Sequence, residues 1–154
     1  MAQKSLIAAL LSIALNAHSS AEVSVAISTI QQGNEVGESP TIFQLARSGD
    51  TTSPLSINLL LRGTALPDLD YIPPTESTGP HSITIASGES TTSVIIPTLS
   101  DGIFDPGESL LAIVQKGPGY IITPGMGRTT AFISAESLVS SAADASYAVG
   151  KSYN

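Results

Sequence analysis

The stretch Val23-Ser24-Val25-Ala26-Ile27 alternates between side chains suited to a buried face and side chains suited to an exposed one. Successive side chains of a β-strand point to opposite faces, so this period of two residues predicts a half-buried strand. Six further short runs, each bounded by Gly, Pro or Ser, extend the pattern along the chain at residues 42–47, 55–61, 82–85, 92–96, 110–114 and 130–133. No helical period separates them.

Seven short strands at turn-punctuated spacing predict an all-β fold, a seven-stranded antiparallel immunoglobulin-like β-sandwich. The core should then come from the two inner faces of the sheets. The side chains expected there are Val25, Ile27, Phe43, Leu45, Ile57, Leu59, Ile83, Ile85, Val94, Ile96, Leu111, Ile113 and Phe132.

The composition narrows the classes of function. The chain has 154 residues and a formal net charge of −7, and it contains no cysteine. This charge repels a nucleic-acid backbone, and no basic patch offsets it. The absence of cysteine excludes disulfides, thiol catalysis and Cys-ligated zinc, and it leaves the cellular compartment open.

The first 21 residues differ from the rest of the chain. Lys4 precedes an apolar run at residues 6–15, and small residues follow at Ser19 and Ala21. This order is typical of a secretory signal peptide, and the run is too short to span a bilayer. A retained helical arm with one apolar face is the alternative reading. We therefore expect a leader or arm at 1–21, a sandwich at 22–136 and an Ala/Ser-rich tail at 137–154.

An acidic loop follows the fifth predicted strand. The stretch Asp101-Gly102-Ile103-Phe104-Asp105-Pro106-Gly107-Glu108 places three carboxylates within eight residues. Crowded carboxylates repel one another unless they are well solvated or share a hard cation, and Ca²⁺ prefers such oxygen ligands. In the alternative reading these acids are solvated, with Asp101 and Asp105 as turn formers.

At this point the chain resembles the Calx-β domain family. The resemblance covers roughly residues 23–136 and its pieces come in one order. They are Glu35-Val36-Gly37, Phe43-Gln44-Leu45-Ala46-Arg47-Ser48-Gly49-Asp50, Arg62-Gly63-Thr64-Ala65, Asp70-Tyr71, Ser82-Ile83-Thr84-Ile85-Ala86-Ser87-Gly88-Glu89, the acidic loop, and Thr129 to Ile133. The family fold is a seven-stranded immunoglobulin-like sandwich, which agrees with the strand pattern.

The resemblance implies a Ca²⁺ site at one end of the sandwich. By position its ligands are Glu35, Asp70, Asp101, Asp105 and Glu108, with the backbone carbonyl of Ile103. Two departures weaken the site: Ser100 replaces an Asp, and the Asp run after the last strand is reduced to Glu136. Fewer carboxylates imply a lower affinity for Ca²⁺.

No catalytic motif accompanies these features. The predicted β region has His81 as its one histidine, and the sequence has no Gly-x-Ser-x-Gly elbow. We therefore predict a non-enzymatic, secreted structural or adhesion module that binds protein partners or copies of itself and has no membrane span. The alternative is a self-assembling subunit, an extracellular filament or a virion surface protein, whose terminal arms contact its neighbours.

Overall fold

The computed structural model describes residues 22–75, 79–100 and 107–134. These residues form strands and turns. The strands are β1 (Ser24–Gln31), β2 (Gly33–Asn34), β3 (Thr41–Ser48), β4 (Leu55–Gly63), β5 (His81–Ile85), β6 (Thr91–Ile96), β7 (Glu108–Val114), β8 (Ile121–Ile122) and β9 (Arg128–Ser134). None of the described residues forms a helix of the length and hydrophobicity needed to cross a bilayer.

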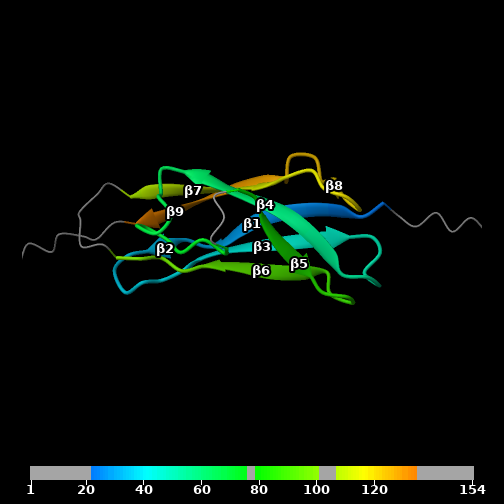
Figure 1. The fold of residues 1–154 in the computed structure, drawn as a ribbon, viewed down its shortest axis with the longest axis horizontal. Helices are drawn as coiled ribbons and strands as arrows, with labels where there is room; N and C mark the ends of the chain where they lie inside the picture. The colour runs from blue at the N-terminus through cyan, green and yellow to red at the C-terminus, as the bar shows by residue number, and fades with distance from the viewer. Residues whose placement is uncertain (1–21, 76–78, 101–106, 135–154) are drawn as a thin grey trace, which may run out of the picture.

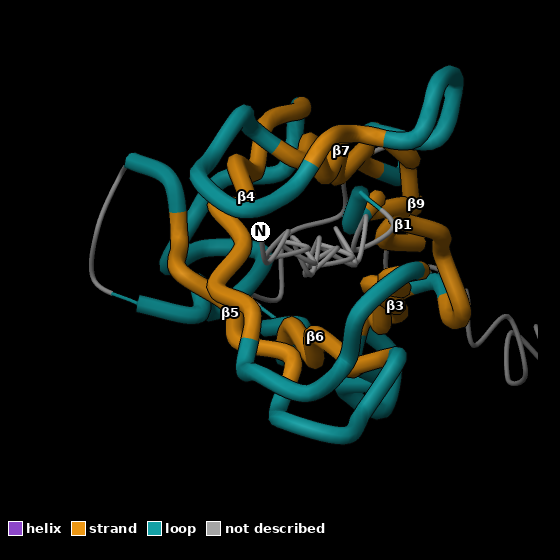
Figure 2. Tube along the Cα trace, turned by 90° about the vertical axis from the view of Figure 1, so that its right-hand side faces the viewer, coloured by secondary structure: helices purple, strands orange, loops and turns teal. Residues whose placement is uncertain are grey.

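The strands pack as two layers (Figure 1). One sheet has the order β6-β3-β1-β8, and the other has the order β2-β9-β7-β4-β5. Figure 2, which looks approximately along the strands, shows β3 and β6 in one layer and β4 and β7 in the other. The all-β sandwich predicted from the alternation is thus confirmed.

The structure adds two very short strands to the seven expected. β8 pairs with β1 and β2 pairs with β9, and both pairs are parallel, whereas the long strands pair antiparallel. Two-residue strands carry too little alternation to be found in the sequence. β8 and β2 pair with part of the edges of β1 and β9 that face away from their antiparallel partners, β3 and β7.

The core lies between the two sheets and contains most of the expected side chains. Ile83 is only partly buried and packs against it. The expected residues that are buried are Val25, Ile27, Phe43, Leu45, Ile57, Leu59, Ile85, Val94 and Ile96.

The prediction that residues face the core is wrong for three side chains of β7 and β9. Leu111 and Ile113 are half-buried, and Phe132 is 58% exposed. The inward rows are instead made by the alternate residues of each strand, Leu110, Ala112 and Val114 in β7 and Ala131 and Ile133 in β9. Residues 110–114 are apolar without interruption, so their sequence does not show which set faces inward. In β9 the larger side chain, Phe132, points outward, because the register with β7 places Ala131 and Ile133 in the inward row.

Arg47 is the one charged residue in the strands of the four-stranded sheet, and it is only 6% exposed. Its guanidinium donates to the backbone carbonyls of Ser53 (2.7 Å), Thr51 (2.9 Å) and Ala86 (3.0 Å), and its Nε donates to that of Glu89 (2.9 Å). A planar fork of donors suits several carbonyls at once. Arg47 therefore ties the β3–β4 loop to the turn between β5 and β6.

The opposite placement of two phenylalanines gives a test of the observed register. Phe43→Ala removes a side chain with no exposed surface and should lower the free energy of unfolding by about 3–5 kcal/mol. Phe132→Ala removes an exposed ring and should cost less than about 1 kcal/mol. Urea unfolding of both variants measures the difference, and equal costs would contradict the outward placement of Phe132.

Candidate metal centre

Three carboxylates meet at one end of the sandwich. Glu35, Asp70 and Glu108 each place one carboxylate oxygen so that all three oxygens lie within 4.8 Å of one another. Glu35 is 3% exposed and Asp70 is 5% exposed, while Glu108 is intermediate. The three residues come from the β2–β3 loop, the β4–β5 connection and the start of β7, so the cluster is built by the fold and not by one loop (Figure 1).

β9 positions two of the three acids. Glu108 pairs in register with Ile133 of β9, and the backbone N–H of Glu35 donates to the Ser134 carbonyl at 3.2 Å. β2 also pairs with Ile133 through Gly33, two residues before Glu35. The end of β9 therefore holds Glu35 on one side and Glu108 on the other.

The alternation of β7 explains why Glu108 points toward this cluster. Side chains two residues apart share one face of a strand, so Glu108 lies in the row of Leu110, Ala112 and Val114. Those three are buried in the core. The inward row of β7 thus begins with a carboxylate at the end of the core, beyond which the apolar packing stops.

Asp70 is fixed by a tight turn in the β4–β5 connection. Its Oδ2 accepts from the backbone N–H of Leu66 at 2.6 Å, and its own N–H donates to the Leu66 carbonyl at 3.0 Å. The carbonyl of Asp70 accepts from the N–H of Leu99, which follows β6, at 2.9 Å. Asp70 is therefore anchored to a segment that continues from the other sheet.

Buried polar oxygens lie close to the start of the loop that carries Glu35. A Cβ added at Gly33 would fall 2.6 Å from Thr41 Oγ1 and 2.8 Å from Thr98 Oγ1, so only glycine fits there. Both hydroxyls, like Asn34 Oδ1, are buried and have no hydrogen-bond partner among the described residues. Such groups in a folded protein commonly contact a water or an ion. Nothing in the sequence singles out these two threonines, since Thr in a β-strand context carries no metal signal of its own.

The donor set fits a hard divalent cation. Ca²⁺ binds oxygen at about 2.3–2.6 Å, so two oxygens on one ion lie at most about 5 Å apart. The separations in the cluster, all within 4.8 Å, satisfy this limit. With no cation present, three ionised carboxylates at such distances would repel one another. Glu35, Asp70 and Glu108 could therefore share one Ca²⁺.

The structure brings together three of the residues expected from the sequence to bind Ca²⁺. The other four, Asp101, Ile103, Asp105 and Glu136, lie outside the described residues and remain predictions. The boundaries expected at residues 21 and 137 likewise have no described residues on their outer side. Among the described residues, Glu35, Asp70 and Glu108 come from distant parts of the sequence and lie together.

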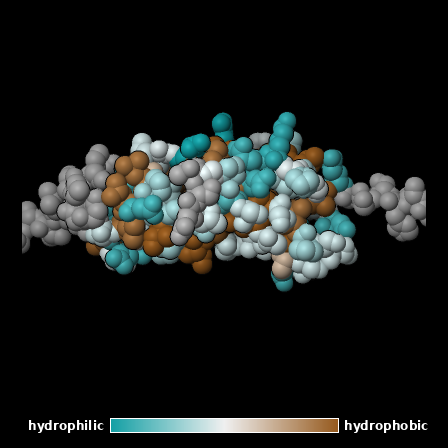
Figure 3. Space-filling model, in the orientation of Figure 1, coloured by the Kyte–Doolittle hydropathy of each residue, from teal (hydrophilic) through white to brown (hydrophobic). Residues whose placement is uncertain are grey.

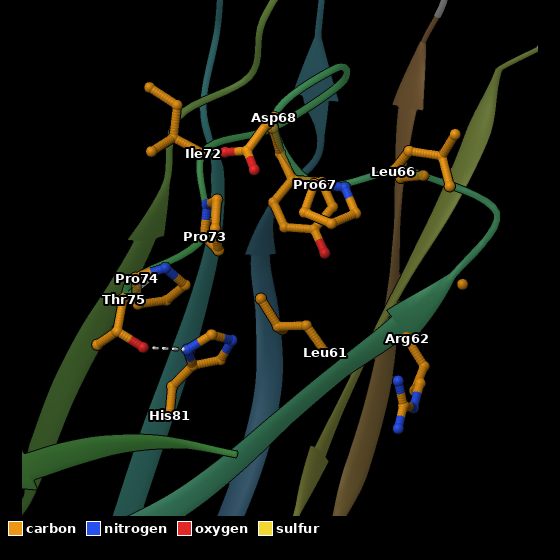
Figure 4. Close-up of a pocket in the computed structure, with 13 residues that line it drawn as sticks. Leu61, Arg62, Leu66, Pro67, Asp68, Ile72, Pro73, Pro74, Thr75 and His81 are labelled. Carbon is orange, nitrogen blue, oxygen red and sulfur yellow. Dashed lines mark hydrogen bonds between the residues drawn. The ribbon is translucent and has the colours of Figure 1, made fainter. Parts of the chain in front are cut away.

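A cavity of about 720 Å³ adjoins the turn that holds Asp70. Figure 4 shows His81 on its wall, with Nδ1 turned toward Thr75 and the opposite edge of the ring toward Leu61. His81 Nδ1 and Thr75 Oγ1 are 2.8 Å apart. The guanidinium of Arg62 lies across β4 from Leu61, and Asp68 lies at the far end of the cavity, so these polar groups do not converge on His81 (Figure 4).

The likeness of this chain to known proteins is limited to the folds of solved structures. No protein-family model matches the sequence, and no curated protein is similar to it. Among solved structures, the apo form of the Calx CBD1 domain is similar with a TM-score of 0.59 and 16% identity, over 75% of this chain and 99% of that one.

Two longer solved structures are also similar. CBD12 from CALX1.2 has a TM-score of 0.56 and 15% identity over 71% of this chain, and the calcium binding domain CBD12 of CALX1.1 has a TM-score of 0.54 and 16% identity over 73%. This chain covers 44% of each of them. At these identities the likeness establishes a Calx-β-like sandwich fold.

His81 should make stability depend on pH. Burial lowers the pKa of its imidazole below the ordinary value of 6.5. The unfolded chain therefore binds the proton more readily, and folding stability should fall as the pH decreases below about 6.5. Urea midpoints measured between about pH 5 and pH 7.5 should show this slope, and His81→Gln should flatten it. A slope that persists unchanged in His81→Gln would assign it to other groups.

Proposed function

We propose that the chain is a member of the Calx-β family that works as a non-enzymatic structural module and binds Ca²⁺ at the end of its sandwich. The observation that carries the proposal is the convergence of Glu35, Asp70 and Glu108 from three separate elements to within 4.8 Å. The fold it shares with domains described as calcium binding supports the choice of ion. The oxygen-only donor set and the separations also favour Ca²⁺.

In this proposal the ion acts mechanically. Glu35 and Glu108 hold it from β9's two neighbours, and Asp70 holds it from a turn hydrogen-bonded to the segment after β6. The ion would cancel the repulsion among the carboxylates and fix the β2–β3 loop against the β4–β5 connection. It would thereby set the shape of the end that meets a neighbouring protein or domain.

Further ligands are proposed from the sequence. Asp101, Asp105 and the Ile103 carbonyl precede Glu108 within seven residues, and Glu136 follows β9 by two. Ca²⁺ takes six to eight oxygens, so three carboxylates alone leave positions for such groups or for water. With Ser100 in place of an acid, we expect an affinity in the range of extracellular modules, about 0.1–1 mM.

We also propose that the chain works outside the cell that makes it. The segment at 1–21 has the order of a secretory leader, and an affinity in this range suits the high Ca²⁺ concentration outside cells. Protein partners or other copies of the chain would bind it there. Mass determination of the mature protein tests export, because a chain starting at Glu22 requires cleavage and a full-length chain contradicts it.

Calcium should stabilise the parent protein and not its site variants. A ligand at about 100 times its Kd adds about 2.7 kcal/mol to the free energy of unfolding, which raises Tm by several degrees. Asp70→Asn and Glu108→Gln each remove one charge from the cluster at nearly constant volume. We expect each to weaken Ca²⁺ binding at least about tenfold, as measured by calorimetric titration.

The control for these variants is Glu89→Gln, which changes the net charge equally at an exposed turn away from the cluster. It should retain the Ca²⁺ response of the parent. The proposal would be wrong if the parent shows no binding heat and no shift of Tm up to about 100 mM Ca²⁺, which is about 100 times the weakest expected Kd. An equal loss of binding in Glu89→Gln would point instead to nonspecific charge screening.

A further inference from the structure

The sheet formed by β6, β3, β1 and β8 presents no charge. The chain has thirteen acidic and six basic residues, yet Arg47 is the only charged residue in the strands of this sheet. Arg47 is buried, and its donors are taken by four backbone carbonyls. The outer face of the sheet is therefore made of Ser, Thr, Ala, Gln and Ile side chains. A surface that stays in water normally carries charges of both signs.

β6 is an open edge of this sheet. Its register with β3 runs from Thr41↔Ile96 to Ala46↔Thr91, and no backbone hydrogen bond joins it to another described strand. Proteins usually protect such an edge with a Lys, a Pro or a bulge inside the strand. Residues 91–96 read Thr-Thr-Ser-Val-Ile-Ile and contain none of these, while β-branched residues favour extended pairing.

Exposed isoleucines lie beside this edge. Ile95 is 59% exposed and pairs in register with the half-buried Ile42 of β3. Ile42 in turn pairs with Gln31 of β1, next to Ile30, which is 57% exposed at an irregularity in that strand. In Figure 3 hydrophobic side chains gather toward the end of the sandwich at which β6 ends. Ile95 and Ile42 thus lie side by side on the outer face at this edge.

We propose that this surface binds a second copy of the chain, with β6 pairing antiparallel to β6 of the other copy. The uncharged outer face permits this partner although each copy has a net charge of −7, because two copies repel each other mainly where both present acidic residues. A second copy also presents an edge of the same length that is equally free of charge. Contact between copies is least opposed where neither is charged. A basic partner would be attracted to the acidic surface instead.

The geometry of the pairing is self-complementary. Two identical edge strands related by a twofold axis run antiparallel, as the isologous interface of a dimer requires. The two four-stranded sheets then form one continuous sheet, and Ile95 of each copy lies beside the strand of the other. Backbone hydrogen bonds supply affinity, and the isoleucines add buried apolar surface. The proposal does not depend on Ca²⁺.

Sedimentation velocity of the full chain, run at several concentrations, tests this pairing. We expect a concentration-dependent species of twice the 15.7 kDa mass of one chain. Ile95→Lys removes an exposed side chain, puts two like charges at the new interface and should raise the dimer Kd at least about tenfold. Amide hydrogen exchange in β6 should be slowed in the parent and fast in Ile95→Lys.

The matched control is Phe132→Lys. Phe132 is 58% exposed on the outer face of the other sheet, so this variant makes the same change of charge at nearly the same exposure. It should dimerise like the parent, and circular dichroism should show that both variants remain folded. A parent that stays monomeric at every concentration overturns the proposal. So does a dimer that Ile95→Lys leaves intact, or one that Phe132→Lys dissociates equally.

Discussion

The strict two-residue alternation of β7, in register with β9, is the constraint on which both the core and the acidic cluster depend. Leu110, Ala112 and Val114 face inward and pack between the sheets, and Glu108 belongs to the same row. A shift of one residue would move Glu108 to the outer face and would bury Ser109, Leu111 and Ile113 in place of the observed row. The carboxylate of Glu108 therefore cannot change face without disrupting the core, because the same register between β7 and β9 fixes both.

This coupling makes the cluster an energetic compromise. Glu35 and Asp70 are almost fully buried, and burying an ionised carboxylate is costly unless it is hydrogen-bonded, paired or bound to a metal. The backbone N–H of Leu66 donates to Asp70 Oδ2 and so stabilises this carboxylate in part. A hard cation shared by the three acids would offset both the desolvation and the mutual repulsion. The fold holds these groups together through backbone pairing whose strength does not depend on the ion.

The alternation and turn residues predicted the sandwich well, because seven long strands each carried a readable pattern. The phases of β7 and β9 were the exceptions, since residues 110–114 are all apolar and fit either face, and Phe132 of β9 points outward while Ile133 points inward. The sequence nevertheless held the missing information for β7. Residues three apart lie on opposite faces of a regular strand, so Glu108 and Leu111 cannot both point inward. A ligand role for Glu108 at the end of the core therefore already indicated that Leu110, and not Leu111, faces inward. For the cluster, the resemblance to the Calx-β family implied Glu35, Asp70 and Glu108 as ligands. Nothing in the sequence pointed to Thr41 and Thr98, which lie near this loop because the fold packs Gly33 against them. The uncharged outer face of the four-stranded sheet could not be predicted either. Its strands are scattered along the sequence and become neighbours only in the folded topology.

The two sheets differ in the chemistry they present, and the end of the sandwich joins them. The five-stranded sheet carries Arg62, Glu108 and Arg128 in its strands, whereas the four-stranded sheet exposes no charge. Glu35 and Glu108 belong to the first sheet through β9. Asp70 reaches the second, because Leu99 donates to its carbonyl and Ile72 donates to the carbonyl of Pro97, the residue directly after β6. An ion bound by all three acids would therefore connect the two layers at this end, and it would do so beside the strand whose edge is open. The same backbone hydrogen bonds that join the turn of Asp70 to the second sheet also hold Pro97 and Leu99, so the chain leaving β6 and the acidic cluster are positioned by one set of contacts.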